Sequence, residues 1–162
     1  MTEQEIYADL SKVFGNSILE FQEEGTHNPT VVVEAGSVAK IITYLKSNER
    51  LQFDSLMNLA GHDPGVESEF NVLYHLYSTP LRHYITLRVL TSREAPTVAS
   101  IAEIHRTADW HEREAFDLFG IIFDGHPDLK RILMEDDWEG YPLRKDYVPA
   151  EFYRGMRIEK VK

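Results

Sequence analysis

The sequence of 162 residues contains no cysteine, and this absence excludes several kinds of chemistry. Disulfide bonds, a cysteine nucleophile, zinc–thiolate sites and cysteine-ligated iron–sulfur clusters are all ruled out within this chain. The sequence also lacks any run close to the roughly 18 apolar residues that a membrane-spanning helix needs. Its acidic start has neither the basic residues nor the apolar run of an export signal. We therefore expect a cytoplasmic location.

The chain also has fewer basic than acidic residues, and its formal net charge is −10. Binding to nucleic acid requires clustered Lys and Arg to neutralise phosphates, so we expect no nucleic-acid partner. Only the segment from Tyr141 onwards is basic, with six basic and three acidic residues. Such a diluted charge is more typical of a solvated or salt-bridged tail than of a lipid-binding surface.

Hydrophobic spacing predicts the elements of the chain. Apolar residues that recur every three or four positions predict helices at 3–14 and 38–48, and an apolar run predicts a strand at 30–33. A further strand is expected over 53–59. Strict alternation then predicts an antiparallel hairpin over 70–89, because the linker between its two strands is too short for any other connection.

A helical region is predicted from Ala95 through Phe119, with Ile101, Ile104, His105 and Ala108 on one side. Adjacent strands with helices before and after them are typical of an α+β fold. We expect a mostly antiparallel sheet with helices packed on one face, plus an extended C-terminal tail. The first strand–helix–strand step is expected to contribute one parallel pair.

The seven histidines do not form a convincing metal site. His105 and His111 are six residues apart, which places them on different sides of a helix. His75 and His83 flank the hairpin and are candidates for cross-strand neighbours. Two imidazoles without a third ligand make a poor metal site, so we interpret these residues as structural.

The charged stretch from His111 to Asp117 does not match a catalytic motif. A metalloprotease helix needs a second histidine four residues after His111, and that position is Ala115. Glu112 and Glu114 diverge by about 200° on a helix, so they cannot act on one substrate as an acid–base pair. We expect a charged helix face, with Arg113 and Asp117 forming a modest ion pair within the helix.

Hydrophobic periodicity stops after residue 134. The last 28 residues contain Pro142 and Pro149, which interrupt any helix, together with many aromatic side chains. Disordered segments are normally poor in aromatics, whereas Tyr and Trp with Arg are typical of protein interfaces. We predict a globular domain over 1–134 and an extended partner-binding tail over 135–162. The alternative, that the tail wraps its own domain, stays open.

One long segment resembles a known family. Its features are Glu112-Arg113-Glu114, Asp117, Leu118-Phe119, His126, Lys130, Ile132-Leu133 and the stretch from Asp136 to Tyr147. This pattern is similar to the hallmark segment of the family of C-type subunits of proton-translocating NADH:quinone oxidoreductase, respiratory complex I. A small departure is Glu135, where Pro often follows the Met.

The resemblance implies a scaffold subunit that is not an enzyme on its own and carries no cofactor. Such subunits lie in the hydrophilic, quinone-module arm, on the cytoplasmic face of the membrane in bacteria, and they touch the membrane only through the complex. The iron–sulfur clusters, FMN and quinone would be held by partner subunits. The expected neighbours in this hetero-oligomer are the D-type subunit, which forms the quinone site, and the B-type subunit, which holds the terminal cluster.

Two sets of residues are predicted to serve partner binding. The residues expected to dock on the D-type neighbour are Trp138, Tyr141, Arg144, Lys145, Asp146 and Tyr147. The residues expected to hold the helix against the tail are Glu112, Arg113, Glu114 and Asp117, and His126 belongs to the same hallmark segment. Two alternatives remain: the equivalent subunit of a membrane-bound hydrogenase or formate hydrogenlyase, and a hydrolase using His126 with Asp124 or Asp128.

Overall fold

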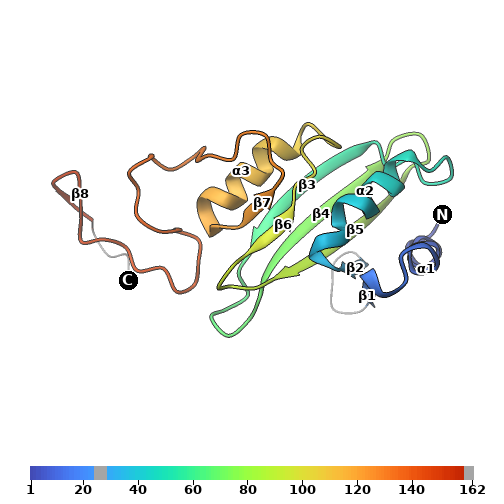
Figure 1. The fold of residues 1–162 in the computed structure, drawn as a ribbon, viewed down its shortest axis with the longest axis horizontal. Helices are drawn as coiled ribbons and strands as arrows, with labels where there is room; N and C mark the ends of the chain where they lie inside the picture. Colours follow the sequence, from blue (N-terminus) through green and yellow to red (C-terminus); the bar gives the residue numbers. More distant parts are fainter. Residues whose placement is uncertain (24–28, 159–162) are drawn as a thin grey trace.

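A five-stranded sheet forms the centre of the computed structural model, which describes residues 1–23 and 29–158 (Figure 1). The strands lie in the order β1-β2-β5-β4-β3. Their bounds are Ile18–Gln22 (β1), Thr30–Val33 (β2), Ser55–His62 (β3), Phe70–Ser78 (β4) and His83–Thr91 (β5). All neighbouring strands are antiparallel except β2 and β5, which run parallel. The α+β class with a mostly antiparallel sheet is thus confirmed.

Within the described residues, three α-helices pack on one face of this sheet (Figure 1). They are α1 (Glu3–Phe14), α2 (Val38–Ser47) and α3 (Ala108–Phe119), and short 3-10 turns occupy Gly15–Ser17 and Ala35–Ser37. Thr2 caps α1 with a reciprocal bond to Glu5. The apolar side chains of all three helices share one core with alternate residues of β4 and β5. No helix among the described residues is long and apolar enough to cross a bilayer.

The hairpin of β4 and β5 has the predicted alternation, with Val72 and Tyr74 buried opposite Val89 and Leu87. The expected pairing of histidines is wrong. His75 lies opposite Thr86, because the turn at residues 79–82 sets a register in which the two histidines are not opposed.

The parallel pair also differs from the expectation. The strand after α2 is β3, which lies at the far edge of the sheet, and the parallel partner of β2 is β5. Strand β1 was not expected, since a bulge between Ile18 and Glu20 interrupts its alternation.

The predicted helical region from Ala95 to Phe119 is helical only from Ala108 onwards. Residues Thr97–Ala99 form strand β6, which pairs in parallel with β7 (Ile122–Asp124) just after α3. This pairing overrides the apparent helical spacing, because β7 supplies hydrogen-bond partners that a local pattern does not show. Strands β6 and β7 thus form a second, two-stranded sheet.

The C-terminal tail consists of an inner and an outer part. The inner tail is defined as residues 129–146, so it begins six residues before the predicted tail, and it runs along α3 and the adjacent end of the main sheet. The outer tail, residues 147–158, leads away from the domain and contains the hairpin of β8 (Phe152–Tyr153) and β9 (Met156–Arg157) (Figure 1). The last four residues of the predicted tail lie outside the described residues.

Candidate functional site

The carboxylate of Asp117 is the main attachment point of the inner tail. It is fully buried on α3 and accepts the backbone N–H groups of Ile132, Leu133 and Met134 at 3.0, 2.7 and 2.8 Å. Arg131 donates to its other oxygen at 2.7 Å. Burial by itself raises the pKa of Asp117, but these donors outweigh that effect and hold the pKa below its usual value. Asp117 is therefore a charged structural anchor.

Two arginines extend this attachment. Arg131 also donates to the carbonyl groups of Trp138 and Gly140. These two hydrogen bonds hold the chain in a turn between residues 131 and 140. Arg113 donates to the carbonyls of Lys130 and Arg131 at 3.2 and 3.1 Å. The predicted ion pair of Arg113 with Asp117 within the helix is not the one that forms, because Arg131 supplies a better-placed guanidinium to the buried carboxylate.

The end of α3 is closed by the tail. The carbonyl groups of Leu118 and Phe119 have no partners within the helix, and they accept from the backbone N–H of Leu143 and from Arg144 Nε. Gly120 follows with φ +72°, and a Cβ there would lie 2.5 Å from the Tyr141 ring. Tyr141 and Arg144 therefore pack against their own domain.

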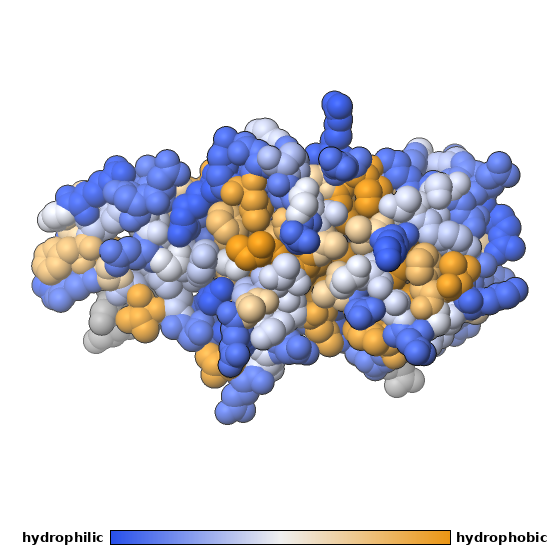
Figure 2. All heavy atoms as spheres, viewed as in Figure 1, coloured by the Kyte–Doolittle hydropathy of each residue, from blue (hydrophilic) through white to orange (hydrophobic). Residues whose placement is uncertain are grey.

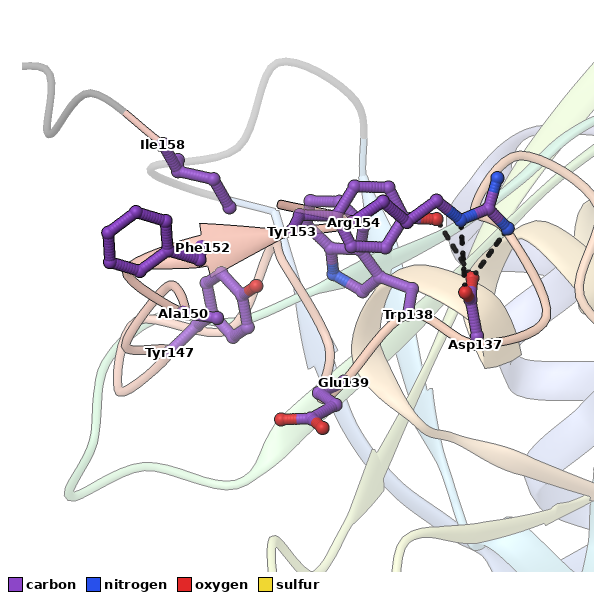
Figure 3. A pocket seen from close by; sticks show the side chains of 9 residues that line it. All are labelled: Asp137, Trp138, Glu139, Tyr147, Ala150, Phe152, Tyr153, Arg154 and Ile158. Atoms are coloured by element: carbon purple, nitrogen blue, oxygen red, sulfur yellow. Dashed lines mark hydrogen bonds and ion pairs between the residues drawn. The ribbon is translucent and has the colours of Figure 1, made fainter. Parts of the chain in front are cut away.

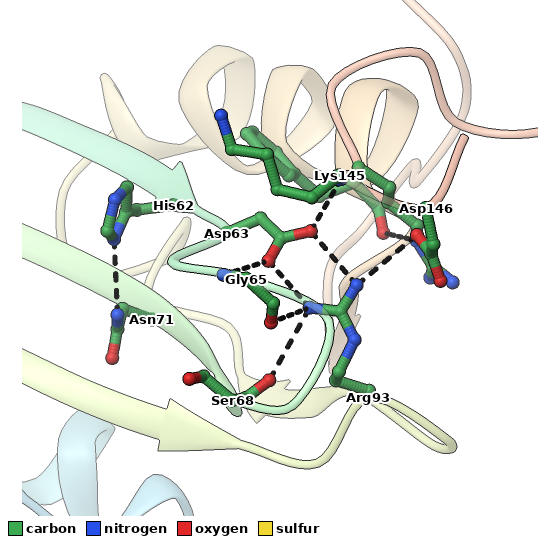
Figure 4. A network of polar contacts seen from close by, with 10 residues as sticks. His62, Asp63, Gly65, Ser68, Asn71, Arg93, Lys145 and Asp146 are labelled. Carbon is green, nitrogen blue, oxygen red and sulfur yellow. Dashed lines mark hydrogen bonds and ion pairs between the residues drawn. The ribbon is translucent and has the colours of Figure 1, made fainter. Parts of the chain in front are cut away.

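A second buried carboxylate, Asp63, holds the next part of the tail (Figure 4). Arg93 binds both of its oxygens, at 2.6 and 3.0 Å, and the backbone N–H of Lys145 donates to it at 2.8 Å. The hydrogen bonds from Arg93 lower the pKa of Asp63 to about 2. Arg93 also pairs with Asp146 at 3.2 Å, so this one guanidinium links the sheet to the tail.

Nothing in the sequence connects Asp63 with the tail, since Asp63 and Lys145 are 82 residues apart. The only local signal was the loop composition after β3, which predicts a turn. Phe70 completes the cluster, because the guanidinium groups of Arg93 and Arg144 lie 4.4 and 4.9 Å from its ring centre.

Glu112 is fully buried, and its hydrogen-bond partners belong to the globular domain. It accepts from Ser100 Oγ at 2.6 Å and from the backbone N–H of Ile101 at 2.7 Å, and burial raises its pKa. The expectation of a solvated charged face is thus wrong for Glu112 and Asp117, because distant segments supply their donors. Glu114 does lie exposed, and it forms no hydrogen bond or ion pair with any described residue.

The side chain of His126 is buried beside Glu112, and both of its ring nitrogens form hydrogen bonds with backbone groups. Nε2 lies 3.2 Å from the carbonyl oxygen of Asp109, and Nδ1 accepts the backbone N–H of Asp128 at 3.0 Å. The carboxylate of Asp128 pairs with Lys130 instead. This arrangement leaves no imidazole nitrogen free to act as a base, so it does not support a hydrolase. Residues 1–23 and 29–158 contain no group of three or more ligating side chains that could hold a metal ion.

The remaining predicted residues lie where the tail leaves the domain. Trp138 is half-buried and its ring lies 5.1 Å from that of Tyr153 (Figure 3). Tyr147 is also half-buried, against Gly140, while the side chain of Lys145 is exposed. Beyond them Val148, Phe152 and Met156 are 79%, 58% and 65% exposed. Figure 2 shows apolar side chains at the surface over the tail, at the left of the view, as well as over the domain.

Comparison with known families matches residues 31–153 to the family described as the respiratory-chain NADH dehydrogenase, 30 Kd subunit. The NADH-quinone oxidoreductase C subunit of Chloroherpeton thalassium is 39% identical over 153 residues, which are 94% of this chain and 63% of that protein. The chain therefore spans less than two thirds of that relative. The corresponding C subunit of Caulobacter vibrioides is 43% identical over 157 residues, covering 96% of this chain and 76% of the relative.

Two solved structures share the fold. A structure described as the trypsin-resistant fragment (1-134) of Nqo5 has a TM-score of 0.65 and 26% identity, covering 79% of this chain and all of the fragment. A structure of the membrane-bound sulfane sulfur reductase, described as an archaeal respiratory membrane complex, has a TM-score of 0.72 over 90% of this chain and 85% of the matched chain. At 21% identity, this second likeness shows the fold alone.

Proposed function

Because the chain belongs to the family of the 30 Kd subunit of respiratory-chain NADH dehydrogenase, we propose that it is a scaffold subunit of a proton-translocating NADH:quinone oxidoreductase. In this role it binds the quinone-site and cluster-bearing subunits, of the D and B types, in the hydrophilic arm. It lies on the cytoplasmic face of the membrane as a peripheral member of a hetero-oligomer. The complex transfers electrons from NADH to quinone, and this chain holds its neighbours in place.

We also propose that the chain holds no redox group and catalyses no reaction alone. The absence of cysteine removes the usual ligands of an iron–sulfur cluster. The acidic side chains that look catalytic in the sequence have structural partners, as Glu112 and Asp117 show. Iron–sulfur clusters, FMN and quinone are accordingly assigned to the partner subunits.

The observation that carries this proposal is the form of the tail. Its inner part is tied to the domain at Asp117 and Asp63, whereas its outer part exposes three apolar side chains to solvent. Apolar side chains exposed together on a projecting segment are typical of a protein interface. Trp138, Lys145 and Asp146 of the inner tail and Tyr147, the first residue of the outer tail, are proposed to contact the D-type neighbour. Tyr141 and Arg144 position it.

A second candidate is the equivalent subunit of a membrane-bound hydrogenase or formate hydrogenlyase. Its support is that a chain of the archaeal sulfane sulfur reductase, a respiratory membrane complex, has the same fold. The identities of 39% and 43% to the C subunits of NADH-quinone oxidoreductases favour the first candidate.

The test is purification of the tagged full-length chain from native membranes, followed by identification of the proteins that accompany it. The proposal predicts recovery of a quinone-site subunit and an iron–sulfur subunit together with an NADH-oxidising module. Recovery with a hydrogenase module supports the second candidate instead. A chain that is recovered alone, or that turns over a small molecule unaided, contradicts both.

A further inference from the structure

The outer tail folds back on Asp137 of the inner tail and forms a closed loop (Figure 3). The carboxylate of Asp137 accepts the hydroxyl of Tyr153 at 2.8 Å, and Arg154 donates to it through Nε at 3.1 Å and Nη2 at 3.0 Å. These bonds join residues 16 and 17 positions apart in the sequence. We call this set of contacts the Asp137 clasp.

Other contacts support the same closed shape. The rings of Trp138 and Tyr153 lie 5.1 Å apart, and the backbone N–H of Ile158 donates to the carbonyl of Glu151 at 2.9 Å. The hairpin of β8 and β9 turns at Gly155, which has φ +80°. The limbs of the loop border an open pocket lined by aromatic side chains, among them Trp138, Tyr147 and Phe152 (Figure 3).

The clasp lies apart from the contacts that hold the domain together. The side chains of Asp137 and Arg154 are each 55% exposed, and their hydrogen bonds and ion pairs with described residues all stay within the tail. The anchors of the inner tail, Asp117 and Asp63, use other partners. Removing the clasp should therefore open the loop without unfolding the domain.

A closed loop matters for binding because ordering a flexible segment during association costs free energy. Ordering the 12 residues of an open chain during association would cost backbone entropy, and a preformed loop is already largely ordered before binding. The loop projects from the domain (Figure 1) and carries Val148, Phe152 and Met156 as exposed apolar side chains. A projecting apolar loop fits a concave apolar surface on its partner.

We propose that Asp137 is a positioning residue for assembly, whose clasp on Tyr153 and Arg154 preforms residues 147–158 as a docking loop for a concave apolar surface of the D-type subunit. This inference rests on the proposed function, since it assumes that the tail binds another subunit. It adds which residue fixes the shape of the binding element and what kind of surface receives it.

The test compares Asp137→Asn with Asp136→Asn in the full-length chain. Asp136 is the adjacent exposed carboxylate and forms no hydrogen bond or ion pair with any described residue, so it is a matched control. Trypsin cleavage after Arg154, followed by mass spectrometry, reports the closed loop directly. We expect cleavage to be about threefold faster in Asp137→Asn, because an exposed ion pair of this kind shifts an equilibrium by a small factor. The melting temperature of the domain should stay unchanged.

Binding is measured as the recovery of neighbouring subunits with each tagged variant from native membranes. We expect about threefold lower recovery with Asp137→Asn, and wild-type recovery with Asp136→Asn and with Asp137→Glu, which retains the carboxylate. The inference is wrong if cleavage after Arg154 does not change in Asp137→Asn. It is equally wrong if cleavage accelerates while recovery stays at the wild-type level. The proposed function survives either outcome provided that the wild-type full-length chain still recovers the quinone-site and iron–sulfur subunits.

Discussion

Asp117 and Asp63 show how single buried carboxylates position a long segment. Asp117 accepts three backbone N–H groups and pairs with Arg131, and Asp63 accepts the backbone N–H of Lys145 and pairs with Arg93. A buried carboxylate is costly unless it is paired and hydrogen-bonded in this way. The need for several donors around one carboxylate explains why the inner tail has a fixed path along the domain.

Replacing Asp117 by Asn should destabilise the chain by about 2–4 kcal/mol, because Arg131 loses its partner and the amide cannot satisfy three N–H donors. Urea unfolding followed by circular dichroism measures the change. Glu114→Gln on the same helix is the control, with an expected effect within about 0.5 kcal/mol, since Glu114 is exposed. Equal effects of the two substitutions would contradict the role of Asp117 as an anchor.

Asp63 should make stability depend on acid pH. Its pKa of about 2 in the folded chain lies below its ordinary value of 3.8, so the unfolded chain binds the proton first. The stabilisation is therefore complete above about pH 4 and is lost as the pH falls towards 2, and it amounts to about 2 kcal/mol. Unfolding in urea at several pH values between 5 and 2 should show a shallower loss for Asp63→Asn. Parallel curves for the two proteins would show that Asp63 does not titrate as described.

Residue roles were predictable from the sequence only where the partners are local. Helix spacing correctly separated Glu112 from Glu114, which face different surroundings. It wrongly predicted a solvated face, because the donors to Glu112 come from Ser100 and Ile101 and those to Asp117 from the segment after α3. Such donors become neighbours only after folding.

At the scale of elements, the tail contacts the domain at the C-terminal end of α3. The tail supplies donors to the last carbonyl groups of the helix, and two arginines place positive charge near its negative end. Gly120 allows this approach, since it combines a positive φ with contact to Tyr141. The helix end and the inner tail should therefore be stabilised together.

Gly120→Ala should cost more than the strain of a left-handed alanine alone, which is about 1 kcal/mol. The added Cβ would overlap the Tyr141 ring, so we expect a total loss of about 3 kcal/mol in chemical unfolding. Gly125→Ala is the matched control, because Gly125 has φ +83° and open space around its Cβ position. If both alanine variants lose the same stability, the close contact of the tail with α3 is not significant.

The elements that the sequence predicted well are those with a strong period of their own. The β4–β5 hairpin and the first two helices have regular apolar spacing and agree with the structure. Strands β6 and β7 are three residues each and exist because they pair with one another across α3. A three-residue strand has no detectable period, so the pattern before α3 was misread as helix.

At the scale of the whole molecule, the chain combines a sheet with helices on one face and a tail that is anchored to the domain at its base and projects from it over residues 147–158 (Figure 1). The sequence predicted that the tail has a purpose beyond the core, from its aromatic side chains and prolines. It did not show which aromatics pack inwards, because Tyr141 packs on Gly120, which follows α3 and is 21 residues away in the sequence. The structure therefore moves the proposed contact outwards, towards residues 147–158.

The central claim is that this outer tail binds a neighbouring subunit through its exposed apolar side chains. The most direct measurement uses a full-length chain with Val148, Phe152 and Met156 all changed to Ser. These side chains are exposed, so the domain should melt as in the wild type. A matched control changes three other exposed apolar residues, Val13, Leu19 and Leu81, on α1, on β1 and in the β4–β5 turn.

Each tagged variant is purified from native membranes, and the quinone-site and iron–sulfur subunits that accompany it are quantified. Burial of three apolar side chains is worth several kcal/mol, so the tail variant should recover at least about tenfold less of both subunits than the wild type does. The control should recover them in full. Undiminished recovery with the tail variant would contradict the claim.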